Sequence, residues 1–506
     1  MHNNVIEINK EMLSFIDKSP NAYYAVGNLM IMLENAGYVR LFEGAKWKLS
    51  HGGKYYVTRD DSSIIAFRIP QMSNADDVAD ESESYVDQDY TGFMIMASHS
   101  DSPAFKIKPD AEITVEKSYV KLNTEKYGGM IMSTWLDRPL SVAGRIVVET
   151  PNGIETKLVN IDRDLCMIPS LAIHMDRKTN EGYSWNAQKD MLPLFAGFID
   201  CDGQTEDDRD DNTGNACCSN LTTDNIERKD TGLSGIIAKE AGVDVSDILD
   251  TDLFLYNRNK GVIFGANGEF VGSGRLDDLQ CAFATMKGFV DSEDKTTDKA
   301  GNFDDSSVDD NGETAGISSI PVCCIFNNEE VGSSTKQGAA SSFLEDVLAR
   351  INYAFDKNEE EIRRIFTNSF MVSADNAHAL HPNHVDKADP TNRPKLNEGI
   401  VIKYNANQKY TTDAVSGGLF RRICKMADVP IQTYVNRSDI AGGSTLGNIA
   451  TTRVSMNSVD IGLPQLAMHS AYETAGVNDT FYLVKATKQF YSVSVKCERD
   501  GKYVVL

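Results

Sequence analysis

The sequence predicts an α/β protein, namely an α/β/α sandwich with a mixed, largely parallel sheet that is interrupted by an inserted, mostly-β domain. Three observations support this prediction. Near both ends of the chain, short apolar segments alternate with segments whose apolar residues recur at helical spacing. In the middle of the chain, apolar and polar residues instead alternate with a period of two, as in antiparallel strands. At 506 residues, the chain is also long enough for several domains of about 150 residues each.

The N-terminal part begins with helical character and continues with strands. Residues 21–36 carry apolar side chains at helical spacing, and Gly37 follows as a helix stop. Residues 54–57 and 63–69 have strand character. The run Phe-Met-Ile-Met-Ala at 93–97 is apolar throughout, which predicts a strand that is buried on both faces of a sheet.

The middle of the chain is expected to form the inserted domain. Residues 145–149 and 153–160 alternate with a period of two, and the pair Asn152-Gly153 between them predicts a hairpin turn. The chain on either side of this insert should then form one discontinuous domain. The predicted domains are 1–103 together with 257–506, and 104–256.

After the insert, helices and strands alternate again. Residues 279–290 and 343–355 each carry an apolar stripe at helical spacing. Short apolar segments between and after these helices predict the strands of the sheet, at 321–326, 370–373, 399–404, 430–435 and 458–463.

The acidic character of the chain argues against nucleic acid or anionic membranes as partners. The net charge is −24, and three stretches alone hold 22 acidic and 3 basic residues: 74–90, 202–211 and 291–313. Blocks of like charge are usually solvated. We therefore expect these stretches to be surface loops, and none of them has the pattern of an EF-hand calcium loop.

Several features predict a cytoplasmic protein. The sequence has no run of about 18 apolar residues that could span a membrane. Its first residues lack a basic region followed by an apolar stretch, so we expect no Sec signal. The nine cysteines form no CxxC pair, and the adjacent pairs Cys217-Cys218 and Cys323-Cys324 have poor geometry for disulfides. These cysteines fit a reducing compartment.

Potential metal ligands follow four of the predicted strands. Because open α/β sheets bind ligands at the carboxyl ends of their strands, we expect these side chains to meet. They are His99 and Asp101 after the first strand, Glu329 and Glu330 after the second, Asp375 after the third and His469 after the last. A further carboxylate, Asp277, lies just before the predicted helix at 279–290, where a helix N-terminus favours an anion.

This mixture of imidazole and carboxylate groups suits zinc, cobalt or manganese better than calcium. The set is too large for one catalytic zinc ion with an open position, but it fits two ions about 3.5–4 Å apart that share a carboxylate and a water. We therefore expect two divalent metal ions per chain, with zinc favoured over cobalt or manganese. Of the adjacent Glu329 and Glu330, one can bind metal while the other takes a proton from the water.

Simpler interpretations of these residues remain open. A histidine after a strand can be structural, adjacent glutamates can belong to a solvated surface, and Asp277-Asp278 can cap a helix. His378, His381 and His384 are a second candidate metal cluster, although their segment has loop character. Motifs of serine hydrolases, P-loop proteins and dinucleotide-binding proteins do not occur in the sequence.

Eight short motifs resemble those of the aspartyl aminopeptidase family, in that family's order and over nearly the whole chain. They are His-Ser-Asp-Ser-Pro at 99–103, Tyr-Gly-Gly at 127–129, Thr-Trp-Leu-Asp-Arg-Pro-Leu at 134–140, Ala-Gly-Arg at 143–145, Arg-Leu-Asp at 275–277, Asn-Glu-Glu-Val-Gly-Ser at 328–333, Ser-Ala-Asp-Asn-Ala-His at 373–378 and Gln-Leu-Ala-Met-His-Ser at 465–470.

The resemblance implies a dinuclear metallo-aminopeptidase. By motif, the ligands would be His99 and Asp375 for one ion and Glu330 and His469 for the other, with Asp277 bridging both. Glu329 would be the general base. Asp101 would orient His99 without binding metal itself, since a ligating histidine usually has such a partner.

The resemblance also implies that the insert is a dimerisation domain and that dimers assemble into a tetrahedral dodecamer. His174 matches a histidine that reaches into the active site of the partner subunit, and Lys403 and Tyr410 match positions that line the substrate pocket. Two positions depart from the family's pattern: Asp278 stands where Asn is commoner, and Lys409 stands where Arg is often seen. Both bear on substrate preference rather than on reaction type.

We therefore expect an enzyme that releases N-terminal Asp or Glu from peptide substrates. The alternatives are an aminopeptidase of neutral or apolar specificity, a dinuclear deacylase or amidohydrolase, and a non-catalytic scaffold. The intact Glu329 and the intact set of ligands favour an enzyme over a scaffold.

Overall fold

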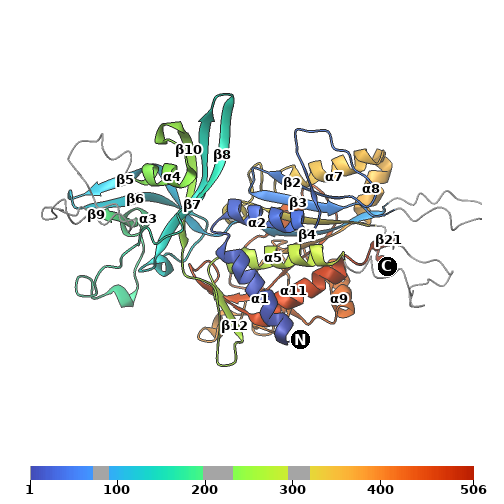
Figure 1. The fold of residues 1–506 in the computed structure, drawn as a ribbon. Coiled ribbons are helices and arrows are strands. Elements are labelled where there is room, and N and C mark those ends of the chain that lie inside the picture. Colours follow the sequence, from blue (N-terminus) through green and yellow to red (C-terminus); the bar gives the residue numbers. More distant parts are fainter. Residues whose placement is uncertain (1, 72–89, 198–231, 294–318) are drawn as a thin grey trace, which may run out of the picture. The chain divides into compact units, whose positions relative to one another are not determined.

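A computed structural model describes residues 2–71, 90–197, 232–293 and 319–506 (Figure 1). The acidic stretches at 74–90, 202–211 and 291–313 lie almost entirely outside these residues. Where the third stretch is described, it begins as the last residue of a helix rather than as a loop. The chain divides into two compact units, one formed by Met1–Ser102 and Lys260–Leu506 and the other by Pro103–Asn259.

The first unit is built on a nine-stranded mixed sheet, of which four central strands run parallel: β13 (Ser319–Phe326), β4 (Gly92–His99), β14 (Phe370–Ala374) and β18 (Asn457–Gly462). Every residue of β4 and β13 is buried, and for β4 this confirms the prediction made from the apolar run at 93–97. The strands on either side complete the order β1-β2-β3-β13-β4-β14-β18-β16-β17, with β1 (Val39–Leu41), β2 (Lys54–Arg59), β3 (Ser63–Arg68), β16 (Ile400–Lys403) and β17 (Ile431–Tyr434).

Helices cover both faces of this sheet, which makes the unit an α/β/α sandwich (Figure 1). Because neighbouring residues of a strand point to opposite faces, Met94 and Met96 of β4 join one core and Phe93 and Ile95 join the other. Against the first face pack α1 (His2–Asp17), α2 (Ala22–Asn35), α5 (Leu276–Asp291), α9 (Ala414–Met426) and α11 (Val477–Phe490). Against the second face pack α7 (Phe343–Ala354), α8 (Glu359–Thr367) and α10 (Leu446–Ala450).

The second unit contains a six-stranded sheet whose named strand pairs are all antiparallel. The predicted hairpin is present, since Thr150 at the end of one strand pairs with Gly153 at the start of the next. The strand order is β8 (Gly153–Asn160), β7 (Leu140–Thr150), β10 (Ile248–Asn257), β5 (Ala104–Val115), β6 (Tyr119–Tyr127) and β9 (Leu194–Gly197). Two helices, α3 (Ala187–Asp190) and α4 (Leu233–Ala241), belong to the same unit.

A smaller five-stranded sheet in the first unit was not predicted from the sequence. Its order is β11 (Val262–Phe264), β12 (Phe270–Ser273), β20 (Glu473–Gly476), β19 (Pro464–Leu466) and β15 (Ala377–His378). The chain ends in a hairpin of β21 (Val495–Arg499) and β22 (Lys502–Val505). In the part of the chain that the structure describes, no helix is both long and apolar enough to cross a membrane.

Candidate metal centre

The predicted ligands gather at one edge of the nine-stranded sheet because their strands run parallel and end together. His99 is the last residue of β4, and Asp375 follows the end of β14 directly. After β13, the chain turns through Asn328, whose φ of 62° lies in the left-handed region, into the short 3₁₀ helix η7 (Glu329–Val331). Both glutamates of the predicted pair are therefore placed beside His99.

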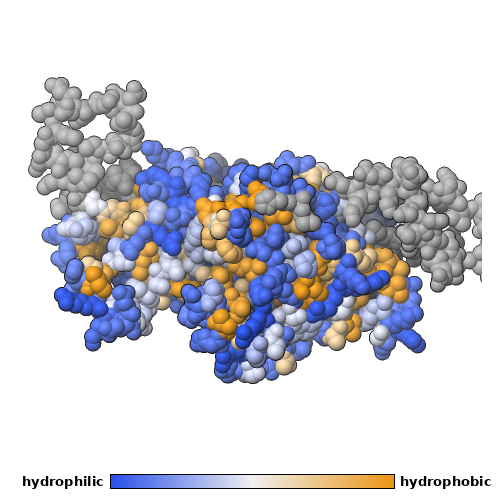
Figure 2. Space-filling model, turned by 90° about the horizontal axis from the view of Figure 1, so that it is seen from below, coloured by the Kyte–Doolittle hydropathy of each residue, from blue (hydrophilic) through white to orange (hydrophobic). Residues whose placement is uncertain are grey.

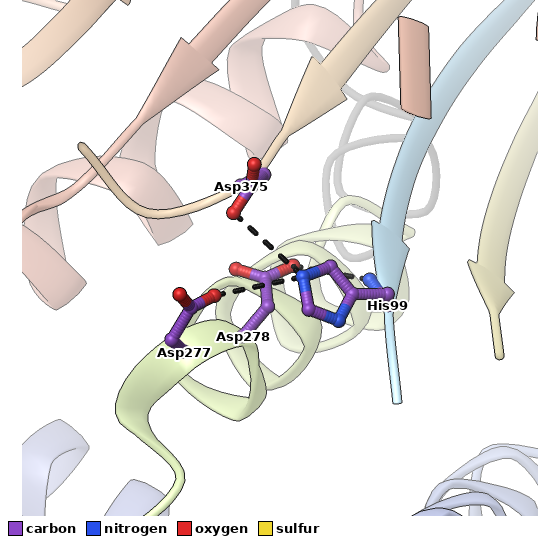
Figure 3. A group of neighbouring side chains, drawn as sticks. All are labelled: His99, Asp277, Asp278 and Asp375. Carbon is purple, nitrogen blue, oxygen red and sulfur yellow. Dashed lines mark hydrogen bonds and ion pairs between the residues drawn. The ribbon is translucent and has the colours of Figure 1, made fainter. Parts of the chain in front are cut away.

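The His99 ring faces a group of carboxylates that come from α5 and from the end of β14 (Figure 3). Its Nε2 lies 3.5 Å from Asp277 Oδ1 and 3.7 Å from Asp375 Oδ1. Its Nδ1 lies 3.1 Å from the backbone carbonyl of Asp101, which fits a tautomer with the proton on Nδ1 and a free electron pair on Nε2. The ring is thereby oriented to offer Nε2 as a metal ligand.

Asp277 also belongs to a second group of possible ligands. His469 Nε2 lies 3.3 Å from Asp277 Oδ2 and 3.3 Å from Glu330 Oε2. In each group, the potential ligand atoms lie within 4.8 Å of one another. Asp277 thus faces His99 with one oxygen and His469 with the other, an arrangement suited to a bridging carboxylate.

Buried oxygen atoms of this cluster fit a metal ion. Asp277 Oδ1, Asp278 Oδ1 and Glu330 Oε1 are buried and have no hydrogen-bond partner among the described residues. A buried polar atom without a partner costs free energy, and a cation would supply the missing interaction. Nitrogen and carboxylate oxygen donors are the ligands that zinc takes in catalytic sites, so the residues present fit such an ion.

The pKa values show how strongly negative charge is concentrated here. Burial raises the pKa of Glu329 to about 8; His99 opposes the shift, and neighbouring carboxylates, led by Asp375, add to it. Burial also raises the pKa of Glu330 well above its usual value, and the charge of Asp277 adds to the shift. Burial alone would lower the pKa of His99, but the surrounding carboxylates, led by Asp278, raise it well above its usual value. A bound cation would offset this repulsion between carboxylates.

Asp101 fixes the turn that carries both glutamates. Its two carboxylate oxygens accept the backbone N–H groups of Glu329 and Glu330, each at 3.1 Å. The same carboxylate lies 3.4 Å from His99 Nδ1. Asp101 is therefore placed to hold His99 and the glutamate turn in one arrangement, and its carboxylate is buried.

The structure also shows contacts that the sequence did not predict, including those of Glu473, which the sequence did not single out. Glu473, on β20, accepts hydrogen bonds from the backbone N–H groups of Asp277 and His469. Asp278 Oδ2 accepts the backbone N–H of His99 at 3.0 Å. The one available signal for Glu473 was its position four residues after His469 in a segment too short to be recognised as a strand.

Lys403 and Tyr410 lie together beside this cluster. Lys403 ends β16 and is buried rather than solvated. Its Nζ lies 3.2 Å from Asp375 Oδ2 and 5.5 Å from the centre of the Tyr410 ring. Burial raises the pKa of the Tyr410 hydroxyl, which keeps that group neutral.

The other histidines considered as site residues from the sequence have other surroundings. His174 lies in an exposed turn of the second unit. His378 contacts the Tyr434 ring, and the rings of His381 and His384 lie 4.9 Å apart. None of these residues belongs to the metal-capable groups found among the described residues.

Residues 15–491 match the family of aminopeptidase I zinc metalloproteases (M18). The chain belongs to the M18 aminopeptidase family. A probable M18 family aminopeptidase 2 of Clostridium novyi is 44% identical over 97% of this chain and 100% of its own length. A probable aspartyl aminopeptidase of Ricinus communis is 35% identical over 96% of this chain and 95% of its own length.

Among solved structures, the mApe1 dodecamer of S. cerevesiae is 26% identical and matches with a TM-score of 0.74, over 97% of each chain. Together with the family match, these similarities make the M18 chain a peptide-bond hydrolase of the aminopeptidase type. The predicted family resemblance and α/β fold are thereby confirmed, and the deacylase and scaffold alternatives are not supported.

Proposed function

We propose that this M18 aminopeptidase uses two metal ions and removes acidic residues from the N-termini of peptides. The observation that carries the two-ion site is that Asp277 belongs to two metal-capable groups at once. His99 and Asp375 would hold one ion, and Glu330 and His469 the other. Zinc is favoured because the family is one of zinc metalloproteases.

When bound, the ions would supply Lewis acidity and lower the pKa of a nearby water. Glu329 would accept the proton of that water at its carboxylate as the water oxygen bonds to the peptide carbonyl carbon. The same carboxyl group would then donate a proton to the amine nitrogen as the C–N bond breaks. Asp101 supports this role because it holds the Glu329 backbone in place.

Lys403 supports the preference for an acidic first residue. A buried ammonium needs a negative partner, and a buried substrate carboxylate needs a positive one. An ammonium has three protons, and the hydrogen bond to Asp375 is the only one that the described residues make with Lys403 Nζ. Tyr410 would add a neutral hydroxyl donor. The similarity to the probable aspartyl aminopeptidase of Ricinus communis points to the same specificity.

We also propose that dimers of the chain assemble into a dodecamer in which His174 reaches the site of a partner subunit. His174 lies within a short exposed segment whose apolar side chains suit a protein contact: Leu171 is 54% exposed, Ile173 46% and Met175 76%. Figure 2 shows hydrophobic residues reaching the surface at several places on one face. The similar S. cerevesiae mApe1 is a dodecamer.

A cytoplasmic location is part of the proposal. The six cysteines that the structure describes are all free thiols, and five of them are buried. Free thiols are retained in a reducing compartment.

The proposed specificity is tested by a scan of aminoacyl-p-nitroanilides with metal-stripped protein to which zinc, cobalt or manganese is restored. Aspartyl and glutamyl substrates should be hydrolysed fastest. Faster hydrolysis of leucyl substrates would refute the acidic preference and leave the two-ion proposal standing.

A further inference from the structure

Glu473 lies between the two chain segments that deliver Asp277 and His469. In the five-stranded sheet, Glu473 of β20 pairs with Ser273, the last residue of β12, from which the chain leads to Asp277. On its other side, β20 pairs with β19, from which the chain leads to His469. Asp277 and His469 therefore follow two strands, β12 and β19, that lie on either side of the strand carrying Glu473.

The carboxyl group of Glu473 connects both segments directly. Its Oε2 accepts the backbone N–H of Asp277 at 3.1 Å, and its Oε1 accepts the backbone N–H of His469 at 2.7 Å. The side-chain amide of Gln465 approaches Oε1 at 3.4 Å. Glu473 is 1% exposed, so water cannot replace these contacts without rearrangement.

The two segments need such support because neither continues its strand in a regular way. Arg275, just before Asp277, has a φ of 59°, and Ala467 and His469 have φ values of 56° and 66°. Non-glycine residues adopt this left-handed conformation only when the surroundings hold them there. One carboxyl group that binds both backbones fixes the spacing between Asp277 Oδ2 and His469 Nε2, which is 3.3 Å.

The other ligands are held differently. His99 is positioned by β4 and by Asp101, and Asp375 follows β14. In the described structure, Glu473 makes no hydrogen bond to either of them. Loss of the Glu473 contacts should therefore act mainly on the site that contains His469, because only that site includes both of the ligands that Glu473 holds.

We propose that Glu473 is a positioning residue that sets the affinity of the metal site formed by Asp277, Glu330 and His469. This inference rests on the proposed two-ion site. It is tested by zinc titration of metal-stripped protein against a chromophoric chelator, which measures binding without reference to activity. His469→Ala and His99→Ala identify which of the two binding steps belongs to which site.

Glu473→Gln keeps the side-chain volume but turns an acceptor into an N–H₂ group that faces a backbone N–H. We expect it to weaken zinc binding by about 10- to 100-fold in the binding step that is absent from His469→Ala. This is the usual effect of removing a contact that supports a metal ligand. The step lost in His99→Ala should change much less. If the Gln variant does not fold, Glu473→Asp gives the same test, because the shorter side chain cannot reach both N–H groups.

Asp479→Asn is the matched control. Asp479 is fully buried and its carboxylate accepts the backbone N–H groups of Asn397 and Gly399 at 2.7 and 3.1 Å, but it belongs to no metal-capable group. This variant should bind zinc as the wild type does. Unchanged zinc affinity in a folded Glu473 variant, or an equal loss in Asp479→Asn, would overturn the inference. If the wild-type protein bound fewer than two zinc ions, the proposed two-ion site would be wrong, and the inference about Glu473, which rests on that site, would fail with it.

Discussion

The ammonium group of Lys403 lies 3.2 Å from a carboxylate oxygen of Asp375, and both residues are buried. Burial alone would lower the pKa of Lys403, but the charge of Asp375 is the main opposing influence, and the pKa is raised above its usual value. Lys403 is therefore a fixed positive charge next to a proposed metal ligand. A substrate carboxylate that enters beside this ligand would meet a charged partner already in place.

Replacing Lys403 by Met should remove that partner and retain most of the buried volume. We expect kcat/KM for aspartyl and glutamyl substrates to fall by about 10-fold or more, as the loss of a charge-assisted hydrogen bond would cause. Hydrolysis of neutral substrates should be largely spared. The measurement is a comparison of kcat/KM for acidic and leucyl substrates in wild type and variant, with metal content determined for both.

Lys425→Met is the control for this substitution, because Lys425 is exposed on α9 and has no proposed role in the site. It removes the same charge from the surface and should leave the ratio of acidic to neutral activity unchanged. If Lys403→Met lowered both activities equally, or if its metal content fell, Lys403 would act through Asp375 and not on the substrate.

The sequence predicts the ligand-bearing strands well because their signal is local. The run at 93–97 is apolar at every position, as required for a strand with helices on both faces, and the structure places it in β4. Once four such strands run parallel, their carboxyl ends must meet, so the proximity of His99, Glu330 and Asp375 follows from topology.

What the sequence does not reveal depends on contacts between short segments. The strands of the five-stranded sheet are too short to show a period, so neither this sheet nor the contact of Glu473 with Asp277 could be predicted. The burial of Lys403 could not be predicted from the sequence either, because a lysine at a strand end is usually solvated. Its burial follows from the approach of Asp375 and Tyr410 from other parts of the chain.

Replacing Glu329 by Gln should separate chemistry from metal binding. The amide cannot accept a proton, and we expect kcat to fall by roughly 10²–10⁴-fold, the usual contribution of a general base. Metal content should stay near that of the wild type, because Glu330 rather than Glu329 faces His469. The measurements are steady-state kinetics and elemental analysis of the same preparation.

Glu330→Gln serves as the comparison for Glu329→Gln, since it changes the adjacent residue in the same way. Glu330 is a proposed ligand, so this variant should lose metal as well as activity. If Glu329→Gln lost metal and Glu330→Gln retained it, Glu329 would be the metal ligand and Glu330 the general base, which is the reverse of our assignment.

Removing the metal should abolish hydrolysis. The candidate site offers paired carboxylates and two histidines, and the sequence contains none of the serine-hydrolase motifs that would supply another nucleophile. Protein stripped with a chelator should recover activity when zinc, cobalt or manganese is added back, and the recovery should saturate at two ions per chain. Full activity in protein that elemental analysis shows to be metal-free would contradict the proposed function.

The last prediction concerns sharing of the active site between subunits. His174 lies in an exposed turn among the apolar side chains of Leu171, Ile173 and Met175, and a partner subunit would cover such a segment. If His174 completes the site of its neighbour, an oligomer that mixes Glu329→Gln with His174→Phe chains will contain some sites with an intact Glu329 from one chain and an intact His174 from the other. Each variant alone should be inactive or nearly so, and the two refolded together should regain part of the wild-type activity. The measurement is hydrolysis by mixed oligomers whose composition is verified by mass spectrometry, with the two variants combined after folding as the control. Verified mixed oligomers that remain as inactive as the separate variants would show that each chain carries a self-contained site.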